Sequence, residues 1–156
     1  MKMSIPLALA QLSMGLSHAA ECAYATHFPD GRYLSALANI CAFWQMQLWH
    51  FLSEKPLSDD FPIYEFSPLV PDTEATKKTG DVLVAALKRF QDDDDPASRL
   101  RLIYEILSDV MRSYSNDTPQ HTLVCTRCGR GYDDLPEKEC VVCNAPTAHI
   151  VAWGEL

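Results

Sequence analysis

Apolar residues recur every three or four positions in four stretches of the chain, which is the spacing of an amphipathic α-helix. The pattern predicts helices at about 5–24, 32–52, 79–91 and 97–114. The fourth is the most regular. The residues that define its apolar face are Leu100, Ile103, Tyr104, Leu107, Val110, Met111 and Tyr114. The periodicity therefore predicts a mainly helical protein.

Helix boundaries follow from local sequence signals. Ser4 is placed to cap the first helix, and Pro6 fits its first turn, where the backbone needs no N–H. Pro29-Asp30-Gly31 predicts a turn before the second helix. Residues 53–76 contain four prolines, which predicts an irregular connection. Asp95-Pro96 predicts the start of the fourth helix, so we interpret the acidic run 92–95 as a cap with solvated charge.

The predicted second helix is apolar around most of its circumference. Tyr33, Leu37, Ile40, Trp44, Leu48 and Phe51 form one stripe, and Leu34, Cys41 and Trp49 widen it. Such a helix is nearly surrounded by protein. It lies either at the centre of the fold or partly at a subunit interface, so Trp44 and Trp49 are expected in one of these two places.

Four cysteines near the C-terminus form two CxxC pairs. Cys125 and Cys128 are followed, after eleven residues, by Cys140 and Cys143. Two tight turns of this kind direct four thiolates at one ion, as in a tetrahedral Cys₄ site. Gly129 and Asn144 stand directly after the pairs, where the turn favours positive φ. We predict a metal site made of these four cysteines, with His121 and His149 not needed as ligands.

Short strands are predicted on both sides of the cysteines, at 122–124 and 148–153. With the paired knuckles they resemble a rubredoxin-like zinc ribbon over about 123–153. Ribbons of this kind bind zinc or iron. Rubredoxins usually carry Cys-Pro-x-Cys-Gly in the second knuckle, whereas this chain has Cys-Val-Val-Cys-Asn, which favours zinc. The alternative is a rubredoxin-like electron-transfer protein with iron in the same site.

The charge of the chain limits its partners. The net charge is -8, and residues 56–120 contribute -6 of it. No segment has the basic cluster that a phosphate backbone requires, so direct DNA contact is doubtful. A protein partner or a homo-oligomer is the expected form of interaction. The other two cysteines, Cys22 and Cys41, are expected to be small core residues.

The first twenty residues bear some likeness to a secretory signal, but Gln11 and Ser13 interrupt the apolar run. No apolar stretch approaches the roughly 20 residues of a membrane span. We therefore expect a cytoplasmic protein without a membrane segment.

Motifs for catalysis are missing from the sequence. The chain has no Glu-x-x-His pair of the kind used by di-iron bundles, and no GxSxG, Walker A or GxGxxG motif. A closed Cys₄ zinc site leaves no coordination position for a substrate. We expect a protein that is not an enzyme.

The order of parts also resembles the C subunit of the bacterial flagellar master transcriptional activator family. The residues that carry this likeness are Ile5, Leu7, Ala8, Gly15, Gly31-Arg32 and the four cysteines with Gly129. The resemblance implies a mostly helical fold, a four-cysteine zinc site, and a DNA-binding hetero-oligomer with a small helical partner.

Together these patterns predict a helical domain at 1–118 and a Cys₄ zinc ribbon at 119–156. The predicted function is that of a non-catalytic, zinc-binding regulatory or adaptor subunit. It would act through protein–protein interaction, within a transcription-regulating complex if the family resemblance holds.

Overall fold

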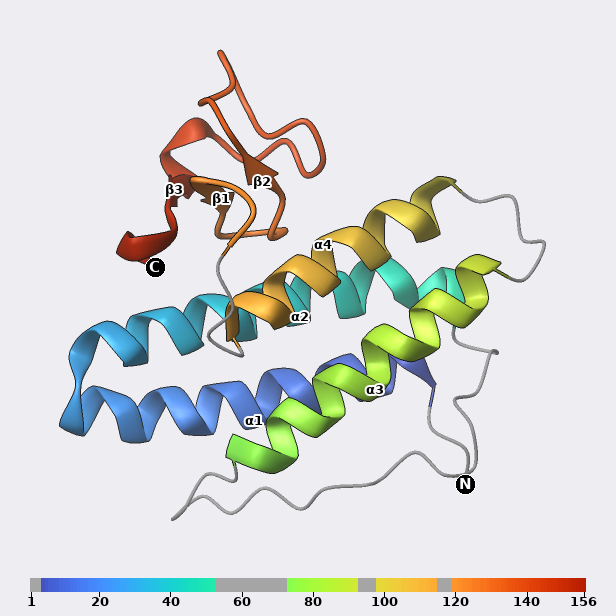
Figure 1. Cartoon of the computed structure of the whole chain (residues 1–156), viewed down its shortest axis with the longest axis horizontal. Helices are drawn as coiled ribbons and strands as arrows, with labels where there is room; N and C mark the ends of the chain where they lie inside the picture. The colour runs from blue at the N-terminus through green and yellow to red at the C-terminus, as the bar shows by residue number, and fades with distance from the viewer. Residues whose placement is uncertain (1–3, 53–72, 93–97, 115–118) are drawn as a thin grey trace.

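The computed structural model describes residues 4–52, 73–92, 98–114 and 119–156. Four helices, α1 (Ile5–Thr26), α2 (Phe28–Leu52), α3 (Thr73–Asp92) and α4 (Ser98–Tyr114), precede three short strands. The strands are β1 (Leu123–Cys125), β2 (Gly131–Tyr132) and β3 (Ile150–Ala152). The predicted fold class, mainly α with a small C-terminal β region, is confirmed (Figure 1).

The start of α1 agrees with the prediction. The Ser4 hydroxyl accepts a hydrogen bond from the Leu7 N–H at 3.4 Å, and Pro6 lies in the first turn. Leu9, Leu12 and Leu16 are fully buried on one side of the helix. The cap and the apolar stripe thus fix where α1 begins and which side of it faces the core.

The predicted turn at Pro29-Asp30-Gly31 is wrong, because these residues lie inside the first turns of α2. The chain reverses at His27, whose backbone is extended (φ -149°). Pro29 is tolerated there since an N–H so close to a helix start has no helical acceptor. A Cβ on Gly31 would lie 2.6 Å from Cδ1 of the Tyr24 ring, so glycine lets α1 and α2 approach closely. Here proline and glycine mark a helix start.

α3 begins at Thr73, six residues before the predicted position. The extra turns read Thr-Glu-Ala-Thr-Lys-Lys, which lacks the apolar spacing used to locate helices. Ala75, Thr76 and Thr79 are nevertheless buried, and the Thr79 hydroxyl donates to the Ala75 carbonyl at 2.9 Å. Small side chains that satisfy their own hydroxyls within the helix can form a buried face without large apolar residues.

α4 begins one residue after the predicted position and ends where predicted. The predicted Asp95-Pro96 helix start and most of the predicted proline-rich connection, 53–72, lie outside the described residues. The predicted domain boundary at 118 falls at the edge of 115–118, which is also outside them.

The helices form two layers. α1 and α2 run antiparallel and contact each other along their length, while α3 and α4 lie across one side of them (Figure 1). The ribbon packs above α2 and α4. Cys125, Cys128, Cys140, Ala145 and Ile150 of the ribbon belong to the same buried cluster as the helical core. The ribbon is therefore packed onto the helices through a shared core.

The ribbon sheet has the order β2-β1-β3 and is antiparallel throughout. Val124 of β1 pairs with Gly131 on one side and Val151 on the other. The strand predicted at 148–153 is shorter than expected, because one-turn 3₁₀ helices occupy Thr147–His149 and Trp153–Glu155. β2 was not predicted, since two residues give no alternating pattern. Across the described ranges, no helix combines the length and apolarity that crossing a membrane requires.

Candidate metal centre

Two turns of the same geometry present the four cysteines. In the first, the Gly129 N–H donates to the Cys125 carbonyl at 2.8 Å; in the second, the Asn144 N–H donates to the Cys140 carbonyl at 2.9 Å. Gly129 has φ +82° and Asn144 has φ +59°, so the predicted positive φ after each pair is confirmed. Both residue types adopt this conformation readily. The sequence thus builds two matching knuckles from local turn chemistry.

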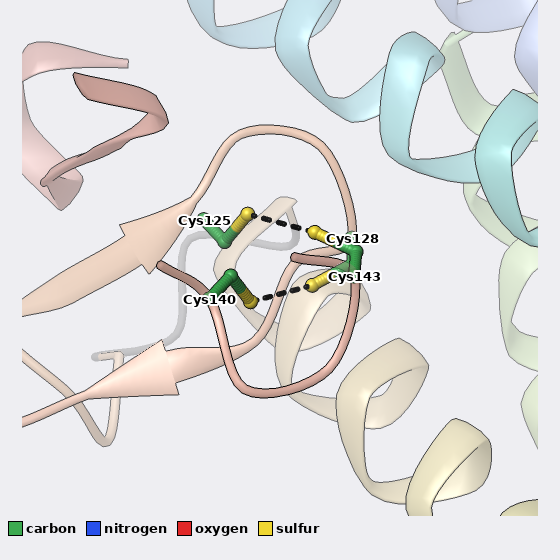
Figure 2. A group of neighbouring side chains, drawn as sticks. All are labelled: Cys125, Cys128, Cys140 and Cys143. Carbon is green, nitrogen blue, oxygen red and sulfur yellow. Dashed lines mark hydrogen bonds between the residues drawn. The ribbon is translucent and has the colours of Figure 1, made fainter. Parts of the chain in front are cut away.

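The four sulfur atoms converge on one point between the knuckles (Figure 2). All lie within 4.8 Å of one another, and the Cys125–Cys143 and Cys128–Cys140 Sγ atoms are 3.6 Å apart. A tetrahedral zinc site with Zn–S bonds of about 2.3 Å has sulfur–sulfur edges of about 3.8 Å. None of the cysteines is in a disulfide. The geometry therefore fits a group able to hold a metal ion.

The surroundings of the cysteines favour negative charge on Cys125 but not on Cys128 or Cys143. A hydrogen bond from the Cys128 thiol, helped by the N–H groups of Cys128 and Arg127, lowers the pKa of Cys125 to about 5. The pKa of Cys128 is raised, because its thiol donates to Cys125 and is buried. Burial raises the pKa of Cys143 to about 11, although the hydrogen bond from the Ala145 N–H acts to lower it. The group thus holds one thiolate readily at Cys125, and a cation would be needed to deprotonate Cys128 and Cys143.

Tyr132 of β2 supports the second knuckle from outside the ligand set. Its hydroxyl lies 3.0 Å from the Cys140 Sγ and accepts a hydrogen bond from the Val141 N–H at 3.0 Å. Burial and the contact with Cys140 raise the pKa of Tyr132, so the hydroxyl keeps its proton and can donate it to the sulfur. Such outer partners orient metal ligands and tune their basicity.

Trp44 of α2 connects the helices to the first knuckle. It is 2% exposed, and its indole Nε1–H donates to the Cys128 carbonyl at 2.6 Å. Gly129 sits beside it, where an added Cβ would lie 2.8 Å from Val110 of α4 and 3.1 Å from Ile40 of α2. The back of the first knuckle is therefore part of the helical core. Loss or exchange of the metal ion would therefore alter the packing of the first knuckle against α2 and α4.

The remaining predicted residues stand apart from the sulfur cluster. The ligand atoms of His121 and His149 are not among those that converge; His121 Nδ1 lies 3.2 Å from the Asp133 carboxylate. Cys41 is buried and Cys22 is half-buried. Trp44 is in the core, whereas Trp49 is 48% exposed. The contacts of Trp44 and Tyr132 with the cysteines could not be inferred from the sequence. Trp44 is one of many residues in a long apolar stripe, and Tyr132 lies in the irregular spacer between the cysteine pairs.

Compared with protein-family models, curated proteins and solved structures, the chain has no significant match. The resemblance to the flagellar activator family thus receives no support from these comparisons.

Proposed function

We propose that the protein is a non-catalytic, zinc-binding regulatory or adaptor subunit that acts by binding another protein. The observation that carries this proposal is the closure of the sulfur group. Cys125, Cys128, Cys140 and Cys143 supply four ligands from rigid knuckles, and three of them are buried. A zinc ion held by four thiolates has no position for a substrate, so its contribution is folding and shape.

The position of the group supports the same role. Its first knuckle is held by Trp44 and packs on α2 and α4, so bound zinc would fix the ribbon in one orientation on the helical layers. A fixed orientation is useful for presenting a composite surface to a partner. The sequence resemblance indicates a transcription-regulating complex as the setting. Because the chain is acidic, a protein is a more favourable partner than DNA.

Electron transfer through iron is the second candidate. Cys143 is only half-buried, and Val141 of the same knuckle is 71% exposed, so one side of the site lies near the surface. An electron-transfer site needs such an approach for its partner. The absence of proline and glycine from the second knuckle weighs for zinc.

Cross-linking and partner identification in the native source would test the adaptor role. Full-length protein, Cys128→Ser and the matched control Cys22→Ser should be expressed at equal levels. We expect one protein to be recovered in stoichiometric amounts with the wild type and with Cys22→Ser, and to be lost with Cys128→Ser. Equal recovery of a partner with the wild type and with Cys128→Ser would contradict the proposal. Purified protein that contains iron with reversible redox activity would also contradict it.

A further inference from the structure

α1 and α2 differ from the rest of the chain in carrying almost no charge. Residues 5–20 contain no Asp, Glu, Lys or Arg, and neither do residues 33–52. α3, by contrast, exposes Lys78, Asp81 and Lys88. In a chain with net charge -8, two adjacent helices therefore form a neutral layer.

Part of this layer is exposed and apolar. Met14 of α1 is 58% exposed and Leu7 is 41% exposed; Met46 of α2 is 69% exposed and Trp49 is 48% exposed. Side chains of this kind, methionine and tryptophan above all, are enriched in protein interfaces. Single exposed apolar residues are common on protein surfaces. Here six large ones come from α1 and α2: the four above, and Tyr24 and Phe28 at the junction between the two helices.

The first four of these residues lie on one side of the layer. Leu7, Ala10 and Met14 form one stripe of α1, and Ala42, Met46 and Trp49 form one stripe of α2. Both stripes lie opposite the buried residues that face α3, α4 and the ribbon. Ser13 donates to the Ala38 carbonyl at 2.8 Å, which sets the antiparallel register of the two helices. In this register the stripes overlap at Leu7, Ala42 and Met46, and Met14 and Trp49 lie at opposite ends of the face. We call the six residues of the two stripes the uncharged face.

We propose that the uncharged face binds a second copy of this chain, so that two α1–α2 pairs pack against each other about a two-fold axis. A two-fold axis places a surface against itself, so a patch whose charges are mostly of one sign would meet that same sign. The chain has a net charge of -8, so a two-fold contact through one of its acidic regions would be opposed by repulsion between like charges. The uncharged face meets its copy without that repulsion and covers apolar side chains on both sides. The inference goes beyond the adaptor role and does not depend on it.

Sedimentation of the full, metal-loaded chain over a wide micromolar range tests this. We expect a species of twice the 17.5 kDa chain mass at high concentration. Met14→Glu and Met46→Glu each place a carboxylate on the uncharged face and should raise the dissociation constant of the dimer about tenfold or more. Both positions are exposed, so the fold and the metal content should stay those of the wild type.

Leu135→Glu is the matched control, because Leu135 is 56% exposed but lies on the ribbon. It should leave dimerisation unchanged. The proposal would be overturned by a wild-type chain that stays monomeric at every concentration. It would equally be overturned by a dimer that survives both methionine substitutions, or that Leu135→Glu dissociates while they do not.

Discussion

At the scale of single residues, Trp44 decides how the ribbon meets the helices. Its indole N–H donates a buried hydrogen bond from α2 to the first knuckle. The acceptor is the backbone carbonyl of Cys128, a candidate metal ligand. A buried carbonyl that loses its donor is left without water as a replacement. The side chain therefore stabilises the ribbon by more than the apolar area it covers.

Trp44→Phe should lower the free energy of unfolding by about 1–3 kcal/mol, since it removes that donor and replaces a buried indole with a smaller aromatic ring. Denaturant unfolding monitored by circular dichroism would measure it. Trp153→Phe is the control: its Nε1 is buried but has no hydrogen-bond partner among the described residues. Equal losses in the two variants would show that the Trp44 hydrogen bond adds nothing to the packing of the ring.

Cys41 offers a second test at this scale. It is fully buried, and burial raises its pKa from the ordinary 9.0 to about 12. The thiolate is the reactive form, and it is populated only as the pH approaches that pKa, so raising the pH from neutral to mildly alkaline should not make Cys41 reactive. Alkylation with mass mapping of the native protein should label the half-buried Cys22 and spare Cys41 until the chain unfolds. Rapid native labelling of Cys41 would place it outside the core.

At the scale of elements, the two knuckles have the same internal hydrogen-bond pattern but different surroundings. Gly129 faces α2 and α4, whereas Asn144 is exposed. Both turns thus need a positive φ, and only the first also needs a residue without a side chain, because its backbone packs closely on the helices. Tyr132 supports the second knuckle in place of the helices.

Gly129→Ala should destabilise the protein by at least about 1–3 kcal/mol, because it combines a strained φ with a Cβ pressed against Val110. Asn144→Gly should change stability by less than about 1 kcal/mol, since glycine adopts the same φ and nothing packs there tightly. Thermal unfolding of the metal-loaded proteins would compare them. A benign Gly129→Ala would mean that the first knuckle does not lie as close to α4 as the structure places it.

Elements with large apolar residues could be predicted from the sequence, and elements without them could not. α4 was predicted almost to its ends, because seven apolar side chains repeat along it, whereas the first two turns of α3 depend on Ala75, Thr76 and Thr79. The four cysteines and the positive φ at Gly129 and Asn144 followed from spacing alone. The contact with Trp44 depends on residues 84 positions apart, which no local pattern specifies.

At the scale of the whole molecule, the ribbon and the helices share one buried cluster while depending on different forces. The helices bury apolar faces against each other, and the ribbon is too small to hold together by its own core. Metal binding would supply the difference, as it does in small metal-dependent modules. We therefore expect the predicted division into a helical part and a ribbon to be a division in what stabilises each part.

Cys128→Ser should abolish metal binding and unfold the ribbon while most of the helical signal remains. Loss of the ribbon would expose Ile40 and Trp44 to water, so we also expect a lower thermal midpoint for the helices. Far-UV circular dichroism and limited proteolysis would follow the two parts separately, with Cys22→Ser as the control. Collapse of the helical signal together with the ribbon would show that the two do not fold as separate parts.

The most direct test of the central claim is native mass spectrometry of the purified, full-length protein. We predict one zinc ion per chain, a colourless solution, and loss of that ion in Cys128→Ser but not in Cys22→Ser. A chain that carries iron, with the absorption bands of an iron–thiolate centre, would contradict zinc and favour electron transfer. A chain that retains no metal, while its ribbon stays folded, would contradict the metal centre itself.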